Sequence, residues 1–178
     1  MRPPAKSGIP LKPADPREAK RALDDLYDRL AKAPDDRTAT QIALRIERRW
    51  MQSGSPTVDL LMVRAMAAMA NDEMPVALDL LDAVVTLKPD YAQGWSLRAT
   101  AEFQSDQTGA AVADLQRALA LDPRNWNTLV GIATVMSDLD KKKEALAAYD
   151  AALKIYPRLE MAKKARDELA PDVEGKDL

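Results

Sequence analysis

Three aspartates are the most regularly spaced residues in this chain that could do chemistry. Asp72, Asp106 and Asp140 follow one another at equal intervals. Carboxylates can bind a metal ion, or they can cap a helix by accepting a backbone N–H at the positive end of its dipole. The interval places them on successive structural units about 10 Å apart, the distance between neighbouring helices, which is too far for one ion to be shared. The pattern therefore predicts helix-capping aspartates in tight turns, where aspartate also tolerates a left-handed backbone better than most residues.

The residues that most enzymes use near neutral pH are missing. The 178-residue sequence has no cysteine and no histidine, which excludes disulfides, thiolate zinc sites and the Ser-His-Asp and Cys-His catalytic arrangements. Most carboxylates stand beside lysine or arginine at helical spacing, as on solvated helix faces. Among only six glycines, no phosphate-binding loop is present. We therefore expect no catalytic residue, no cofactor and no metal. Catalytic turnover that is abolished by changing a single carboxylate would instead indicate an enzyme.

The helices that position the three aspartates can be predicted from a sequence repeat that has the same interval. A proline, two alanines and several apolar positions recur with it, once in each of three segments. The matching sets are Pro89/Pro123/Pro157, Ala77/Ala111/Ala145, Leu61/Trp95/Leu129, Ala65/Ala99/Ala133, Leu81/Leu115/Tyr149, Val84/Ala118/Ala152 and Leu87/Leu121/Ile155. A period of about 34 residues predicts an all-α fold, a solenoid of helical hairpins. The prolines would end the second helices, and the alanines would let paired helices approach closely.

The repeats divide the chain into one array with flanking segments. The regular units are 58–91, 92–125 and 126–159, each with two helices joined by a short turn. Before them, 17–56 is predicted to be a degenerate hairpin, in phase through Ala43, that caps the array. After them, 160–170 is predicted to form a capping helix. The segment 1–16 holds five prolines and is expected to be a flexible lead-in, and 171–178 to be a disordered tail.

These units resemble the tetratricopeptide repeat family. The resemblance is carried in the middle unit by Trp95, Ala99, Ala111, Leu115, Ala118 and Pro123, and in the third unit by Leu129, Ala133, Ala145, Tyr149, Ala152 and Pro157. It implies a right-handed superhelix of antiparallel hairpins whose first helices line a concave groove, and a non-catalytic adaptor that binds other proteins. Small chains of this kind are common in proteobacteria and often exported. The resemblance thus implies a periplasmic or exported location if Met1 replaces a removed signal peptide, and a cytoplasmic one otherwise.

One ligand of the family is not expected here. A well-known subtype grips the C-terminal carboxylate of a chaperone peptide with Lys and Asn at the fifth and ninth repeat positions. In this chain those positions hold Met62/Met66, Ser96/Thr100 and Val130/Thr134. Because the cationic clamp is missing, the resemblance does not extend to an acidic C-terminal peptide.

An apolar partner-binding groove is expected instead. The candidate residues come from the first helix of each unit and are Met62, Met66, Met69, Ser96, Thr100, Phe103, Val130 and Thr134. Methionine is flexible, polarisable and common on adaptable binding surfaces. A hydrophobic or amphipathic segment of a partner protein would fit such a groove, and the threonines could hydrogen-bond its backbone. Two alternatives stay open: the methionines pack as core against the preceding hairpin, especially Trp50, or the groove or an end helix pairs with a second copy of the chain.

The charges give weaker indications. The net charge is −2 and unevenly spread, with 12 Lys/Arg against 8 Asp/Glu over 1–56 and 9 against 14 over 57–156, so no basic field is present to hold nucleic acid. No stretch approaches the roughly 20 apolar residues of a membrane span. Arg64 and Arg98 occupy the same position of two successive units, and we expect them to pair with carboxylates across the helix seam rather than flank the groove. Lys141, Lys142 and Lys143 stand at a helix start, where positive charge is unfavourable, and could form an exposed contact patch.

Overall fold

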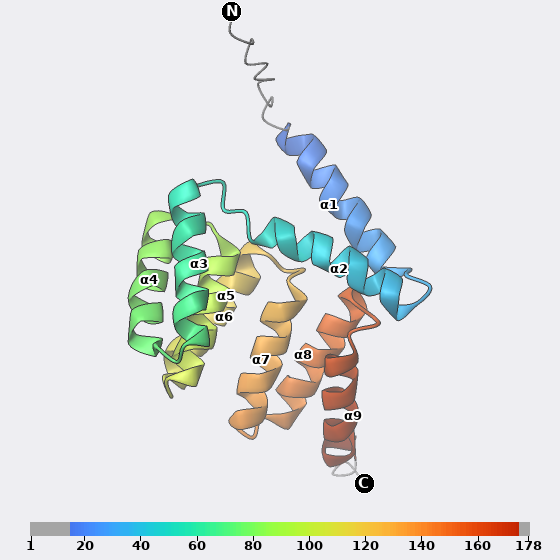
Figure 1. The fold of residues 1–178 in the computed structure, drawn as a ribbon. Helices are drawn as coiled ribbons and strands as arrows, with labels where there is room; N and C mark the ends of the chain where they lie inside the picture. The colour runs from blue at the N-terminus through green and yellow to red at the C-terminus, as the bar shows by residue number, and fades with distance from the viewer. Residues whose placement is uncertain (1–14, 175–178) are drawn as a thin grey trace, which may run out of the picture.

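The computed structural model describes residues 15–174, and all regular structure within them is helical (Figure 1). Nine α-helices follow one another in this range: α1 (Pro16–Ala31), α2 (Asp36–Trp50), α3 (Pro56–Ala70), α4 (Met74–Leu87), α5 (Ala92–Gln104), α6 (Thr108–Leu121), α7 (Trp126–Asp138), α8 (Lys142–Ile155) and α9 (Glu160–Glu174). The all-α prediction of consecutive hairpins is confirmed. The predicted lead-in lies almost wholly outside the described residues, as does the end of the predicted tail after Glu174.

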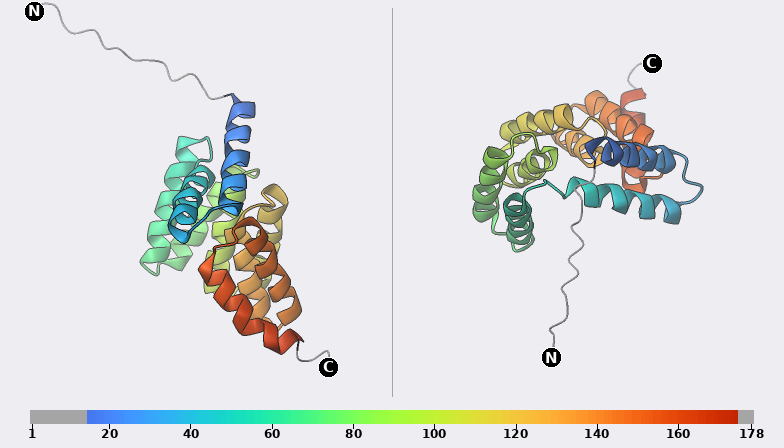
Figure 2. Two further views of the ribbon diagram at one scale, coloured as in Figure 1. Left: turned by 90° about the vertical axis from the view of Figure 1, so that its right-hand side faces the viewer. Right: turned by 90° about the horizontal axis from the view of Figure 1, so that it is seen from above.

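The three regular units form one curved array. The hairpins are α3–α4, α5–α6 and α7–α8, and each second helix also packs on the first helix of the next unit, ending with α8 on α9. The right-hand view of Figure 2 shows α3 to α9 following an arc. Ala77, Ala111 and Ala145 are fully buried in the hairpins, as their small side chains require for close helix packing. The periodic prolines stand two residues after α4, α6 and α8, and therefore end these helices.

The turn aspartates adopt the predicted left-handed backbone but do not cap the helices that follow. Asp72, Asp106 and Asp140 have φ values of 61°, 60° and 55°. The next helices α4, α6 and α8 have no side-chain cap hydrogen bond, so the capping prediction is wrong. The aspartates instead end the preceding helices. The residue after each one donates its N–H to the carbonyl five residues back, as in Gln107 to Glu102 at 2.8 Å, which is the 6→1 bond of a Schellman motif.

The first hairpin does not stack on the first regular unit, contrary to the prediction of an N-terminal cap. Helices α2 and α3 are not among the pairs that pack together, whereas α1 packs on α8. Figures 1 and 2 show α2 crossing from the top of α3 toward the end of α8, on the inner side of the arc. The reason is an aromatic cluster in which Trp126 of α7 contacts Trp50, Tyr27 and Tyr156, with ring centroids 4.3, 6.1 and 5.4 Å away.

Two arginines fix this hairpin to the array. Arg158, after α8, donates to the carbonyls of Ala33 and Pro34 at 2.9 and 2.6 Å and pairs with Asp36 at 2.7 Å. Arg124, after α6, pairs with Asp24 at 2.7 Å, and its guanidinium lies 4.1 Å from the centre of the Tyr27 ring. Each arginine directly follows a periodic proline, whereas Asp90 follows Pro89 in the first unit. The arginine contacts therefore belong to the second and third units, whereas the first unit holds α2 through the Tyr91 hydroxyl, which donates to the Trp50 carbonyl at 2.8 Å.

The C-terminal helix is longer than predicted. Helix α9 continues through Pro171 to Glu174, so the first residues of the predicted disordered tail are helical. Lys142 at the start of α8 forms an ion pair with Asp172, which holds this last turn against the array. That lysine belongs to the predicted contact patch, so part of the patch is occupied within the chain. Across residues 15–174, no helix is both long enough and apolar enough to cross a membrane.

Candidate functional site

Two of the eight predicted groove residues lie in the core. Met62 is fully buried in a cluster with Val58, Leu81, Val84 and Tyr91. It therefore packs as core, but not against Trp50 as the alternative stated, since Trp50 belongs to a different cluster. Ser96 is also buried, and its hydroxyl accepts a hydrogen bond from Thr128 at 3.1 Å. Both face the neighbouring helices because the fifth position of a unit points into the seam between units rather than into open space.

Three further residues are only partly available. Val130 packs against the cluster that joins the first hairpin to α7 and α8, so that hairpin covers it. Met69 is half-buried against the α3–α4 core, and Met66 is half-buried on the same helix. The predicted groove is therefore not continuous from α3 to α7.

The last three candidates come together at one cavity. Thr100 and Phe103 of α5 and Thr134 of α7 line a space of about 310 Å³ between the C-terminal halves of these helices. Its remaining walls are Ala99, Gln104, Leu115, Gly131 and Val135. Apart from Gln104, the side chains that this second set contributes are apolar. We take this cavity, called the α5–α7 cavity below, as the candidate binding site.

Gly131 accounts for the position of the cavity and was missed in the sequence. The same position holds Val63 and Leu97 in the other units, but a Cβ on Gly131 would lie only 3.0 Å from a methyl carbon of Leu115. The glycine thus lets α7 approach α6 and leaves the space beside it unfilled. A glycine inside a helix costs about 1 kcal/mol relative to alanine, so its place in mid-α7 was the signal that could have been used.

The threonines present hydrogen-bond acceptors at the cavity mouth. Thr100 and Thr134 are exposed, and their hydroxyls donate to the carbonyls of Ser96 and Val130 at 3.1 and 3.0 Å. This i−4 bond uses the hydroxyl proton and leaves the oxygen lone pairs free to accept. An N–H of a bound backbone could therefore be received at either edge, while the floor takes an apolar side chain.

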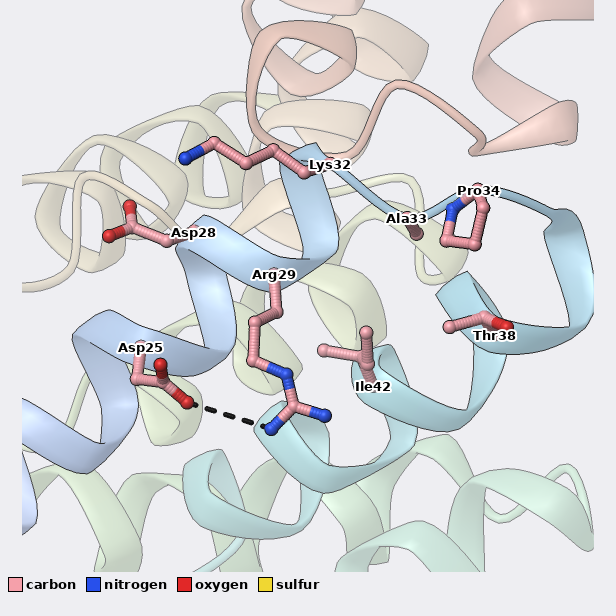
Figure 3. Close-up of a pocket in the computed structure, with 8 residues that line it drawn as sticks. All are labelled: Asp25, Asp28, Arg29, Lys32, Ala33, Pro34, Thr38 and Ile42. Carbon is pink, nitrogen blue, oxygen red and sulfur yellow. Dashed lines mark ion pairs between the residues drawn. The ribbon is translucent and has the colours of Figure 1, made fainter.

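A second cavity lies in the first hairpin and has a different character. It measures about 440 Å³ and is lined by Asp25, Asp28, Arg29, Lys32, Ala33, Pro34, Thr38 and Ile42 (Figure 3). Arg29 reaches toward Asp25, at 3.6 Å, one helical turn away. Exposed pairs of this kind are solvated and weak, and Figure 3 shows no group of charged atoms converging on one point. The α5–α7 cavity is the better candidate for recognition.

Comparison with known proteins identifies the family. Residues 64–137 match the model of the tetratricopeptide repeat. A TPR repeat-containing protein of Rhizobium etli is 35% identical over 156 residues, which are 88% of this chain and 76% of that protein. The chain belongs to the tetratricopeptide repeat (TPR) family.

Solved TPR structures share the fold. The TPR domain of Sgt2 from Aspergillus fumigatus is 24% identical, with a TM-score of 0.65 over 69% of this chain and 83% of that one. The first TPR domain of Spaghetti (RPAP3), solved with the HSP90 peptide SRMEEVD, is 18% identical, with a TM-score of 0.64 over 67% of this chain and 95% of that one. At these identities the likeness concerns the fold.

The middle repeat of this TPR protein contains an ionic cluster that is buried at Asp114 and Glu102 and reaches the surface at Asp82. Arg98 binds Asp114 of α6 through two hydrogen bonds of 2.6 and 2.9 Å and Asp82 of α4 through one of 2.7 Å. The prediction that Arg98 pairs with carboxylates across the helix seam is thus confirmed. Glu102 lies 3.8 Å from the same guanidinium and is 8% exposed, and its second carboxylate oxygen is buried without a hydrogen-bond partner. In the third repeat the positions of Arg98, Glu102 and Asp114 hold Ile132, Met136 and Ala148. The middle repeat therefore has charged residues at positions where the third repeat has apolar ones.

The carboxyl group of Glu102 should make stability depend on pH. Burial, and next the negative charge of Asp114, raise its pKa to about 7 despite the opposing charge of Arg98. A pKa above the unfolded value means that the folded state binds the proton more tightly. The stabilisation is then complete below about pH 4.5 and is lost as the pH rises through about 7. We expect Glu102→Gln to flatten this loss, so that the variant is the more stable protein at pH 8 and no more stable at pH 5.

Urea unfolding at pH 5 and pH 8 measures this difference. The matched control is Glu73→Gln, because Glu73 is exposed in a turn; it should keep the pH dependence of the wild type. Equal pH dependence in the wild type and Glu102→Gln would show that Glu102 does not titrate in this range.

Proposed function

We propose that this TPR protein is a non-catalytic interaction module that binds an apolar or amphipathic segment of a partner protein in the α5–α7 cavity. The observation that carries the proposal is the arrangement of Phe103, Leu115 and Val135 around an open space whose edges hold Thr100 and Thr134. Such a site can bury one large apolar side chain of the partner. The threonine oxygens then fix the direction of its backbone through hydrogen bonds.

The chemistry of the cavity separates this ligand from the acidic peptide bound by the RPAP3 domain. The fifth and ninth positions of each repeat provide methionine, serine, threonine and valine, with no lysine or arginine. A carboxylate placed there would lose its hydration without gaining a cation, which costs several kcal/mol. We therefore expect the peptide SRMEEVD not to bind this chain.

The first hairpin restricts the length of the bound segment. Since it covers Val130 near the start of α7, a partner has access to the C-terminal halves of α5 and α7. A short segment that enters from this side fits the exposed part of the inner surface. A long peptide lying along all three first helices would have to displace α2.

A blocking substitution tests the site. We expect a random-peptide display library selected on the full chain to yield peptides with one recurrent large apolar residue. Thr134→Trp should fill the cavity from its exposed edge and weaken the selected peptides by about 10- to 100-fold in Kd, since burying an apolar side chain contributes about 1.5–3 kcal/mol. Fluorescence anisotropy with labelled peptides measures the change.

A matched control keeps the result specific to the cavity. Thr40 of α2 is also exposed, and its hydroxyl also bonds to the carbonyl four residues earlier, so Thr40→Trp makes the same change away from the site. Peptides that bind Thr134→Trp as tightly as the wild type would place their site elsewhere. Selection of acidic peptides without an apolar anchor would overturn the proposed ligand class.

A further inference from the structure

The outer face of α3 and α4 is an uncovered apolar surface at one end of the array. On one side α4 packs on α5, and none of the described helices covers the other side (Figure 1). Among residues 15–174, seven large apolar side chains are exposed, and four belong to this hairpin: Leu60, Val63, Val76 and Leu87. Repeat arrays usually end in polar surfaces. Helix α9 at the opposite end fits that rule, with Lys164, Asp167 and Glu168 exposed.

The register of the repeats shows what this face does elsewhere in the molecule. The third and tenth positions of the second unit are Gly94 and Ala101, and both are buried against α4 of the unit before. In the third unit the same positions are Thr128 and Val135, which are buried against the second unit. In the first unit they are Leu60 and Ala67, which are exposed. On α3 this face is therefore the packing surface of a repeat without its neighbour. On α4, Val76 and Asp79 occupy positions that are exposed in the stacked second unit as well.

The first hairpin of the same chain, α1–α2, fits this outer face of α3–α4 poorly. A Cβ at Gly94 would lie 2.7 Å from a methyl carbon of Val84 in the preceding helix, and the third unit has the fully buried Thr128 at this position, so the stacked units use residues smaller than leucine there. Leu60 stands there in the first unit, and it would hold a stacked α2 away. The first hairpin is, moreover, attached to α7 and α8 by the cluster around Trp126.

The charges on the face complement one another between two copies. The counterpart of Arg64 is Arg98, which binds a carboxylate of the unit before it. Arg64 is exposed and forms no ion pair within the part of the chain that the structure describes, and the same is true of Asp79 on α4. A partner for the face should thus offer an apolar helix with a carboxylate to Arg64 and an arginine to Asp79. The α3–α4 hairpin itself offers both.

We infer that the outer face of α3–α4 is a self-association surface that binds the same face of a second copy of this chain. Helices α3 and α4 are antiparallel, so the middle of α3 near residue 63 lies level with the middle of α4 near residue 80. A two-fold axis parallel to the helices keeps these levels and sets each α3 against the partner's α4. It brings Leu60 opposite the partner's Ala83, Ala67 opposite the partner's Val76, and Arg64 opposite the partner's Asp79. Large side chains then meet small ones, and two ion pairs form across the axis.

Sedimentation equilibrium of the full chain over a concentration series tests the surface. We expect the wild type to dimerise and Leu60→Asp to weaken the dimer by about 10- to 100-fold in Kd, the range for losing one buried leucine at an interface. The matched control is Met161→Asp on α9, because Met161 is 59% exposed and Leu60 is 54% exposed; it should dimerise like the wild type. A wild type that stays monomeric at the highest concentrations would overturn the inference, as would equal effects of the two substitutions.

Charge reversal tests the geometry. Arg64→Asp and Asp79→Arg should each weaken the dimer, and the double variant should restore it, because the two ion pairs are re-formed with opposite sign. Failure of the double variant to recover would reject the proposed two-fold arrangement.

Cross-linking gives an answer even if Leu60→Asp fails to fold. The chain has no cysteine, so Ala67→Cys and Val76→Cys can be mixed as two single variants without background. Oxidation should give mainly the mixed disulfide dimer. Lack of that product, with both variants folded, would exclude the α3-to-α4 contact. The test is independent of the α5–α7 cavity, since Leu60, Ala67 and Val76 do not line it.

Discussion

Replacing Trp126 by alanine should destabilise this protein by about 3–5 kcal/mol and release the first hairpin from the array. The side chain is fully buried and contacts Trp50, Tyr27 and Tyr156. Its loss removes the centre of the cluster and leaves a cavity between segments that are far apart in sequence, which cannot readily close. Chemical denaturation gives the free energy of unfolding, and amide hydrogen exchange follows α1 and α2 separately.

Trp95 provides the control for this substitution. It lies on α5, is half-buried, and donates its indole N–H to the carbonyl of Pro89 at 3.0 Å, away from the first hairpin. Trp95→Ala should cost less and leave the exchange of α1 and α2 unchanged. If Trp126→Ala has no larger effect than Trp95→Ala, and α1 stays protected, then the aromatic cluster does not hold the hairpin.

Replacing Arg98 by alanine should cost about 3–5 kcal/mol, because it leaves buried carboxylates without their cation. Asp114 is buried and receives two of the hydrogen bonds that Arg98 makes, and Glu102 lies beside them. The exposed Arg117 of α6 is the control, and Arg117→Ala should change the unfolding free energy by less than about 0.5 kcal/mol. Urea unfolding measures both.

The third repeat supplies the rescue variant. Arg98→Ile, Glu102→Met and Asp114→Ala together introduce the residues found at the same positions of the next unit, namely Ile132, Met136 and Ala148. Replacing a whole buried ionic group by apolar residues is often neutral or stabilising, so the triple variant should recover most of the stability that Arg98→Ala loses. A triple variant as unstable as the single one would mean that the seam of the middle repeat requires the ionic cluster for its shape.

The cavity shows how far the repeat pattern can locate a site. Thr100, Phe103 and Thr134 could be found because groove helices point the same positions of each unit in the same direction. Met62 and Ser96 follow the same rule but lie in the seams between units, where burial depends on how closely neighbouring helices approach. The distance between neighbouring helices depends on individual residues such as Gly131, a position at which the other units have no glycine.

The sequence by itself determined the helices, the register of the three regular units and the left-handed turns of the aspartates. These features depend on contacts between residues close in sequence or one repeat apart, which the repeat period makes visible. The tertiary structure alone decided where the first hairpin lies, that the turn aspartates end helices rather than begin them, and which groove positions stay open. The hairpin is held by Trp126, Tyr156, Arg124 and Arg158, which contact α1 and α2 across most of the chain length. Such contacts are set by the shape of the folded array, and no local periodicity encodes them.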